Sequence, residues 1–420
     1  MTGSASTFTA IFLTALLTTT LLRLWLANRH MRHIAAHRDA VPAAFSENIT
    51  AVEHQRAADY SIAKLRVSFV DLFVGAAFLL VLTLGGVLQA LYEVWADVFN
   101  PGGYAHGIAI IASLSVLSFV VDLPFSLYRT FVLEERFGFN KMTVRLWLID
   151  LVKSTLLGAA IGLPLLFAVL WLMAQMGAYW WLWVWALWMS FNLLAMLIYP
   201  TWIAPLFNKF TLLSDDTLRA RIEALLKRCG FRASGLFVMD GSKRSGHGNA
   251  YFTGFGAAKR IVFFDTLLEK LAPQEIEAVL AHELGHYKHK HVWKRIFVIA
   301  LASLGFLWLL GMLIAEPWFY QGLGVSGQST AVALILFVMV VPLFTFPFAP
   351  LMSAFSRRHE YEADAYAAQQ TQANDLVTAL VKLYRDNAAT LTPDPLYSTF
   401  YDSHPPAAAR IAQLRGLANA

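Results

Sequence analysis

The sequence predicts a mainly α-helical membrane protein with seven spanning helices and a mixed α+β part outside the membrane. The chain has 420 residues, of which 57% are hydrophobic and only 15% are charged. Soluble domains carry about 25% charged residues, so a soluble protein of this composition would expose too much apolar surface to water. Seven apolar stretches approach the roughly 20 residues that cross a bilayer core. They run over 8–27, 67–91, 107–128, 154–173, 180–199, 296–314 and 331–355.

Lys and Arg are distributed unevenly among the connections between these stretches. The connection 28–66 carries six of them and 129–153 carries five, whereas 94–106, 175–179 and 316–330 carry none. Short loops rich in Lys and Arg stay in the cytoplasm. With seven spans, all the basic loops fall on one side of the membrane, which predicts an N-terminus outside and a C-terminus in the cytoplasm. An error of one span would break this alternation.

The spans divide the chain into four segments. Two of these segments are polar and lie on the predicted cytoplasmic side, where they can pack together although two spans separate them in sequence. The segments are 1–199 with spans one to five and their cytoplasmic loops, 200–295 as the first polar segment, 296–355 with spans six and seven, and 356–420 as the second polar segment.

Short strands and one amphipathic helix are predicted within the first polar segment. The stretches 236–239, 250–255 and 260–264 are rich in aromatic and β-branched residues, and glycines interrupt them, which is typical of strands. A helix is predicted to begin at Pro273, because the missing N–H of proline costs nothing in a first turn. Apolar residues then recur at three- and four-residue spacing, which indicates that one face of this helix is buried.

His282 and His286 are four residues apart on this predicted helix, so their side chains lie on one face, one turn apart. Two imidazole nitrogens so placed can bind one metal ion at about 2 Å each. Glu283 lies between them, displaced around the helix, where it can act as a general base on water without being a ligand. This HExxH arrangement is typical of zinc peptidases. The alternative is a surface helix whose His and Glu residues are incidental.

A catalytic zinc ion needs a third protein ligand and one open position. The segment 358–364, which follows the last span and looks helical, contains the candidates. Glu360 and Asp364 share a face of that helix, whereas Glu362 points away from it. We predict that Glu360 is the third ligand and that Asp364 holds a ligand histidine through its other ring nitrogen. His359 is an alternative ligand, and a solvated acidic helix face is the alternative structure.

Several further motifs, taken with these two, resemble the type I CAAX prenyl proteases. The resemblance covers nearly the whole chain, and the motifs occur in the same order. They are Leu123-Pro124-Phe125, Glu134 through Lys141, Pro205 through Phe210, Asn249-Ala250-Tyr251-Phe252-Thr253-Gly254, His282-Glu283-Leu284-Gly285-His286, Glu360 to Asp364, and His404-Pro405-Pro406.

The resemblance implies seven helices that enclose a chamber inside the membrane and a cytoplasmic α+β zinc metalloprotease domain near the chamber's cytoplasmic end. It implies one zinc ion per chain and cleavage of C-terminal CAAX peptides, often prenylated. The strand of Asn249, Ala250 and Tyr251 would bind an extended peptide by added-strand pairing. His404 would stabilise the oxyanion, and Arg410 would join the substrate-binding residues. Without the resemblance these residues are a turn Asn, a loop His and a surface Arg.

Two alternative functions fit part of the sequence. An HtpX-like membrane quality-control protease shares the two metal-binding patterns but has a shorter chain with fewer spans. A catalytically inactive homologue would act as a binding partner or chaperone, but the intact His282, Glu283, His286 and Glu360 argue against it.

The expected partners are a peptide or protein substrate and the lipid bilayer. The net charge of +5 is mild, and no phosphate-binding loop or basic-aromatic patch stands out, so no nucleic-acid partner is expected. The oligomeric state stays open. The last residues, 416–420, carry no ER-retention signal, which favours a bacterial inner-membrane protein.

Overall fold

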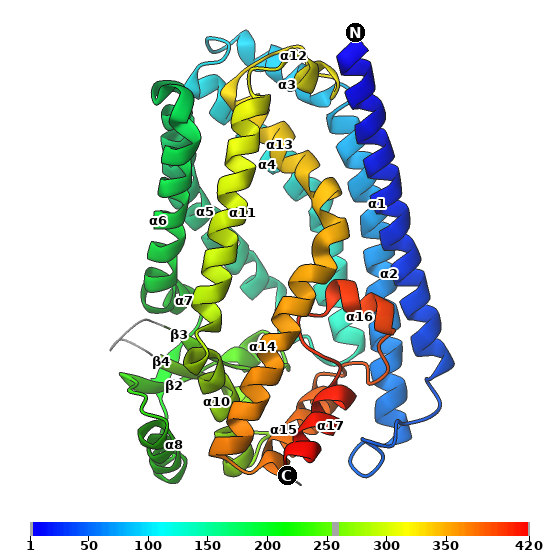
Figure 1. Ribbon diagram of the computed structural model, residues 1–420, viewed down its shortest axis with the longest axis vertical. Coiled ribbons are helices and arrows are strands. Elements are labelled where there is room, and N and C mark those ends of the chain that lie inside the picture. Colours follow the sequence, from blue (N-terminus) through cyan, green and yellow to red (C-terminus); the bar gives the residue numbers. More distant parts are fainter. Residues whose placement is uncertain (1–2, 254–259, 419–420) are drawn as a thin grey trace.

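The computed structural model describes residues 3–253 and 260–418 (Figure 1). Seven helices of this described part are long and apolar enough to cross a membrane, as predicted. They run roughly along the long axis of the molecule, and the two termini lie at its opposite ends (Figure 1). They are α1 (Gly3–Ala36), α2 (Ala51–Leu82), α4 (Tyr104–Tyr128), α5 (Val144–Gln175), α6 (Trp180–Ile198), α11 (His291–Leu313), and α13 (Thr330–Thr345) with its continuation α14 (Ala349–Gln370).

The predicted second span, 67–91, is wrong at its C-terminal end, and its helix begins before residue 67. Helix α2 begins at Ala51, where Thr50 and Glu53 form a capping box, and it ends at Leu82. A turn follows in which Gly86 has a φ of 81°, a left-handed conformation that glycine adopts without strain. The chain then enters a separate helix, α3 (Val87–Ala96). Because α3 is also apolar, hydropathy alone does not reveal the break.

The last span extends further than the predicted 331–355. A short 3-10 turn over Phe346–Phe348 joins α13 to α14, and α14 then runs on to Gln370. Pro342 lies inside α13 and Pro347 lies in the turn, where each removes a backbone donor and favours a change of direction. This continuation carries the segment around Glu360 out of the apolar part of the bundle.

A four-stranded sheet lies beyond the end of the bundle, in the order β1-β2-β4-β3. Strand β4 (Arg260–Phe264) is parallel to β2 (Gly235–Met239) and antiparallel to β3 (Ala250–Thr253). The sequence did not predict β1 (Phe210–Leu212), whose three residues are too few to show alternation. The end of the predicted strand 250–255, at Gly254 and Phe255, lies outside the described residues. Strand β3 is therefore an edge strand of the described sheet.

Helices from both polar segments surround this sheet and share one core with it. Helix α10 (Pro273–Lys288) begins where the sequence predicts. Ile222, Phe263, Leu284 and Ile411 are all buried in the common core, although they come from four different elements. The remaining helices are α7 (Ala204–Phe207), α8 (Asp216–Arg228), α9 (Asp265–Leu268), α12 (Pro317–Gln321), α15 (Ala373–Asp386), α16 (Pro395–Tyr401) and α17 (Ala407–Ala418).

Helices α10 and α14 approach each other closely at Gly285. A Cβ atom on Gly285 would lie 2.8 Å from the Cα of Ala363 and 3.1 Å from its carbonyl oxygen. Those atoms belong to the backbone and cannot rotate away. Glycine at this position therefore permits the close packing of the two helices that carry the predicted metal ligands.

We expect Gly285→Val to destabilise the protein by about 1–3 kcal/mol, because overpacking at a helix contact forces the backbones apart. The thermal unfolding midpoint of the purified protein in detergent measures this. Gly305→Val in α11 is the matched control, since no atom lies within 4 Å of a Cβ there. Equal midpoints for the two variants would contradict the packing argument.

Candidate metal centre

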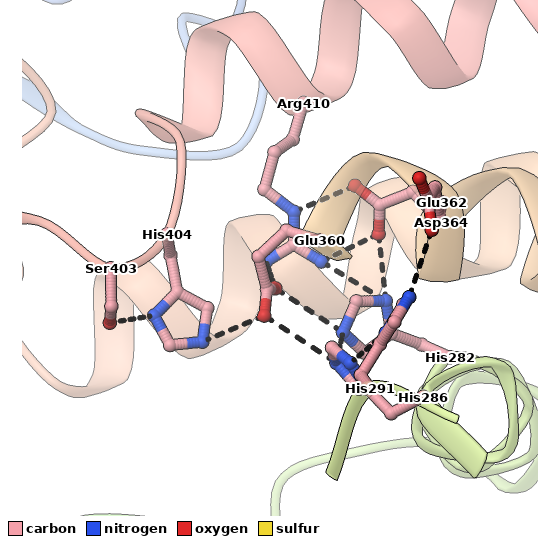
Figure 2. A network of polar contacts seen from close by, with 9 residues as sticks. All are labelled: His282, His286, His291, Glu360, Glu362, Asp364, Ser403, His404 and Arg410. Carbon is pink, nitrogen blue, oxygen red and sulfur yellow. Dashed lines mark hydrogen bonds and ion pairs between the residues drawn. The ribbon is translucent and has the colours of Figure 1, made fainter. Parts of the chain in front are cut away.

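The structure brings His282, His286 and Glu360 together at the contact of α10 with α14 (Figure 2). One ligand atom from each residue lies within 4.8 Å of the others. The Nε2 atoms of His282 and His286 are 3.3 Å apart, and each lies 3.4 Å from a carboxylate oxygen of Glu360. Ligands about 2.0–2.1 Å from a tetrahedral zinc ion are separated by about 3.3 Å, so this spacing fits zinc.

Asp364 and Arg410 position His282 through its Nδ1 atom. The Nδ1–H of His282 donates to Asp364 Oδ1 at 2.8 Å, which leaves Nε2 directed at Glu360. Arg410 donates through two nitrogens to the same carboxylate, at 2.8 and 2.6 Å. Both Asp364 and Arg410 are buried. The structure therefore places Arg410 behind the metal ligands, which differs from the substrate-binding role expected from the resemblance.

A second chain of hydrogen bonds holds His286. Its Nδ1 lies 2.9 Å from Nδ1 of His291, whose Nε2 lies 2.9 Å from Glu362 Oε2. Because Nε2 of His291 donates to the carboxylate, its Nδ1 accepts a hydrogen bond from His286. The Nε2 atom of His286 then carries a lone pair directed at the centre. This arrangement is typical of metal-ligating histidines.

The donor set fits a metal cation. Two imidazole nitrogens and a carboxylate converge on one point, and both nitrogens can offer lone pairs there once His282 is deprotonated. The Oε2 atom of Glu360 is buried, 3.4 Å from Nε2 of His282 and 3.7 Å from Nη1 of Arg410. Burial lowers the pKa of His282, but hydrogen bonds to Asp364 and Glu360 outweigh it and raise that pKa to about 9. Metal binding must therefore displace a proton from His282, so acid weakens it.

Glu283 and His404 complete the centre. Burial raises the pKa of the Glu283 carboxyl, which lies between the two histidines along α10. The Nε2 atom of His404 lies 3.4 Å from Glu360 Oε1, and its Nδ1 contacts the Ser403 hydroxyl at 3.0 Å. His404 is more exposed than the three candidate ligands and also lines a cavity.

The edge strand β3 lies against α10. Phe252 of β3 packs against Tyr287, the residue that follows His286, with ring centroids 5.3 Å apart. Asn249 precedes the strand and is exposed, and its side-chain oxygen accepts a hydrogen bond from the N–H of Ala250 at 2.8 Å. Tyr251 packs against Phe264 of the neighbouring strand. The predicted substrate-binding strand therefore flanks the helix that carries the histidine pair.

The sequence interpretation missed His291 and Glu362. His291 is only 4% exposed and contacts His286 directly. Lys290 adopts a left-handed φ of 56°, and this turn brings the start of α11 back against the end of α10. Glu362 points away from Glu360, as predicted, and in doing so it reaches His291. His359 stacks on His291 and is not part of the metal-binding group.

We expect His291→Gln to weaken zinc binding about 10- to 100-fold, because His286 would lose the partner that orients its ring. Competition with a fluorescent zinc chelator on the purified protein measures the affinity. His289→Gln provides the control, because His289 is exposed and two residues away. If both variants bind zinc within threefold of the wild-type affinity, His291 does not orient His286.

Comparisons with known proteins agree with this geometry. Residues 30–209 match the family of CAAX prenyl protease N-terminal domains with five membrane helices, and residues 213–418 match peptidase family M48. The chain is 36% identical to the CAAX prenyl protease 1 homolog of Arabidopsis thaliana, over 88% of each chain. It is 38% identical to CAAX prenyl protease 1 of Saccharomyces cerevisiae, over 82% of this chain and 78% of the relative.

A solved structure shows the same architecture. The crystal structure of S. mikatae Ste24p superposes with a TM-score of 0.91 at 33% identity, covering 97% of this chain and 99% of that one. These similarities favour neither the HtpX-like nor the catalytically inactive alternative.

Proposed function

Because this chain belongs to peptidase family M48, with the CAAX prenyl protease N-terminal domain, and is a membrane metalloprotease, we propose that it uses one zinc ion to cleave C-terminal CAAX peptides. The convergence of two imidazole nitrogens and the buried Glu360 carboxylate on one point carries this proposal. The relatives named CAAX prenyl protease 1 support the substrate class.

His282, His286 and Glu360 would hold the zinc ion. When bound there, zinc supplies a Lewis acid that polarises the scissile carbonyl and makes water more acidic. The carboxylate of Glu283 takes a proton from the attacking water and delivers it to the leaving amine. Asp364, held by Arg410, and His291, held by Glu362, keep the two imidazole rings in the required tautomers.

His404 and β3 would position the substrate. The Nε2–H of His404 faces the centre and can donate a hydrogen bond to the carbonyl oxygen as negative charge develops on it. The edge of β3 that pairs with no described strand can pair with an extended peptide, so Ala250 and Tyr251 would contribute main-chain hydrogen bonds. Asn249, exposed at the start of the strand, would bind the substrate backbone.

We further propose that the catalytic end of the molecule faces the cytoplasm of a bacterial cell, with the N-terminus outside the inner membrane. The basic connections 28–66 and 129–153 support this orientation. In Figure 1 the N-terminus lies at the end opposite the sheet and α10.

We expect Glu283→Gln to lower kcat about 100- to 10,000-fold while zinc content stays near one per chain, because the general base is lost and the ligands remain. Hydrolysis of a quenched CAAX peptide and metal analysis of the purified protein measure both. Glu360→Ala should abolish zinc binding and activity together. A chelator should have the same effect on the wild-type protein.

Glu269→Gln is the control for these variants, because Glu269 is exposed on another helix end. Hydrolysis that survives both chelation and Glu283→Gln would refute the mechanism. Comparing farnesylated, unprenylated and unrelated peptides then tests the substrate class.

Single cysteines test the orientation. Cys229 is the only cysteine of the chain, so Cys229→Ala provides a clean background. We expect Thr217→Cys, exposed on α8, to react with an impermeant maleimide only after permeabilisation. Gln328→Cys, exposed at the opposite end, should react in intact cells. The reverse pattern would overturn the orientation.

A further inference from the structure

A cavity of about 550 Å³ opens beside the metal centre, on the side of His404. Ser403, His404 and Pro406 line it, and the rest of its wall comes from α1, α2, α15, α16 and the connections after α15 and α16. No described residue of β3 contributes to this wall. A peptide that pairs with β3 and crosses the metal centre therefore has a separate space in which its remaining residues can lie.

Helix α2 turns a polar stripe toward this cavity. Ser61, Lys64 and Ser68 all line it, and their spacing of three and four residues places them on one helix face. Ser61 and Lys64 belong to the predicted cytoplasmic connection 28–66, so the stripe lies toward the predicted cytoplasmic end of α2. Two hydroxyls and an ammonium group on one wall indicate a polar ligand.

Lys64 forms no close ion pair with the described residues, although the Glu134 carboxylate acts on it from further away. No carboxylate oxygen of the described residues lies within 4.0 Å of its ammonium group. Its Nζ instead lies over the ring of Tyr60, 4.4 Å from the centroid. The nearby Glu134 carboxylate is engaged by other groups, since it accepts a hydrogen bond from Tyr60 and lies 3.5 Å from Nε2 of His247. The ammonium group is therefore free to bind an anion from the cavity.

Other polar groups line the same cavity. Burial raises the pKa of the Asp402 carboxyl. The Nδ1 atom of His30 accepts a hydrogen bond from the N–H of Asp394 at 3.1 Å, so its other nitrogen carries the hydrogen. The cavity thus places the ammonium group of Lys64 beside the hydroxyls of Ser61 and Ser68, which can donate hydrogen bonds to a carboxylate.

We propose that Lys64 binds the C-terminal carboxylate of the substrate and so selects peptides that end a few residues beyond the cleaved bond. The inference rests on the proposed function, because a CAAX motif ends in a free carboxylate. A bond cleaved inside a four-residue motif is at most three residues from that carboxylate, which is about 10 Å of extended chain. The cavity begins at His404 and includes Lys64, so it provides an end point for such a short segment.

The test compares three quenched peptides of one sequence on the purified full-length protein. The first ends in a free acid, the second in an amide, and the third continues two residues beyond the motif. We expect wild-type protein to cleave the free acid with a kcat/KM about 10- to 100-fold above the other two, chiefly through KM. Cleavage of all three within threefold would overturn the proposal without any variant.

Variants assign the preference to Lys64. We expect Lys64→Met to reduce the acid-to-amide ratio to about one, and Lys64→Arg to retain most of it. Lys227→Met is the control, because Lys227 is exposed on α8, outside the cavity. A preference that persists in Lys64→Met would also overturn the proposal. If wild-type protein shows no chelator-sensitive cleavage of any peptide, the proposed function fails, and this inference fails with it.

Discussion

The close contact between α10 and α14 is the constraint on which the candidate metal centre depends. Helix α10 supplies two imidazoles and α14 supplies the carboxylate, so neither helix forms the centre alone. The absence of a side chain at Gly285 lets the two backbones approach. Two membrane spans, α11 and α13, separate these helices in sequence. The membrane bundle therefore determines where the two parts of the soluble region meet.

Two hydrogen-bonded chains then give the centre its chemical character. Asp364 and Arg410 act on His282, and His291 with Glu362 acts on His286. Each chain engages the Nδ1 atom of its histidine, so the Nε2 atoms of His282 and His286 both face Glu360. These partners come from α11, α14 and α17. The metal-binding chemistry is thus distributed over elements that are distant in the sequence.

The location of the centre explains how a reaction on a peptide can take place next to a membrane domain. The centre lies where the long helices meet the sheet, and one cavity beside it includes His404 in its wall. A second cavity, lined mainly by α1 and α2, shares Leu65, Ser68, Tyr397 and Tyr401 with the first. The centre is therefore next to spaces that reach toward the membrane helices.

The sequence by itself determined the number of spans, the helix that begins at Pro273, the His282–His286 pair and three of the four strands. These features have local signatures, namely long apolar stretches, helical spacing and β-branched composition. The tertiary structure alone decided the break after Leu82, strand β1, the burial of His291 and the position of Arg410 against Asp364. Such features depend on contacts between segments far apart in the chain, and a contact of that kind leaves no periodic pattern in either segment.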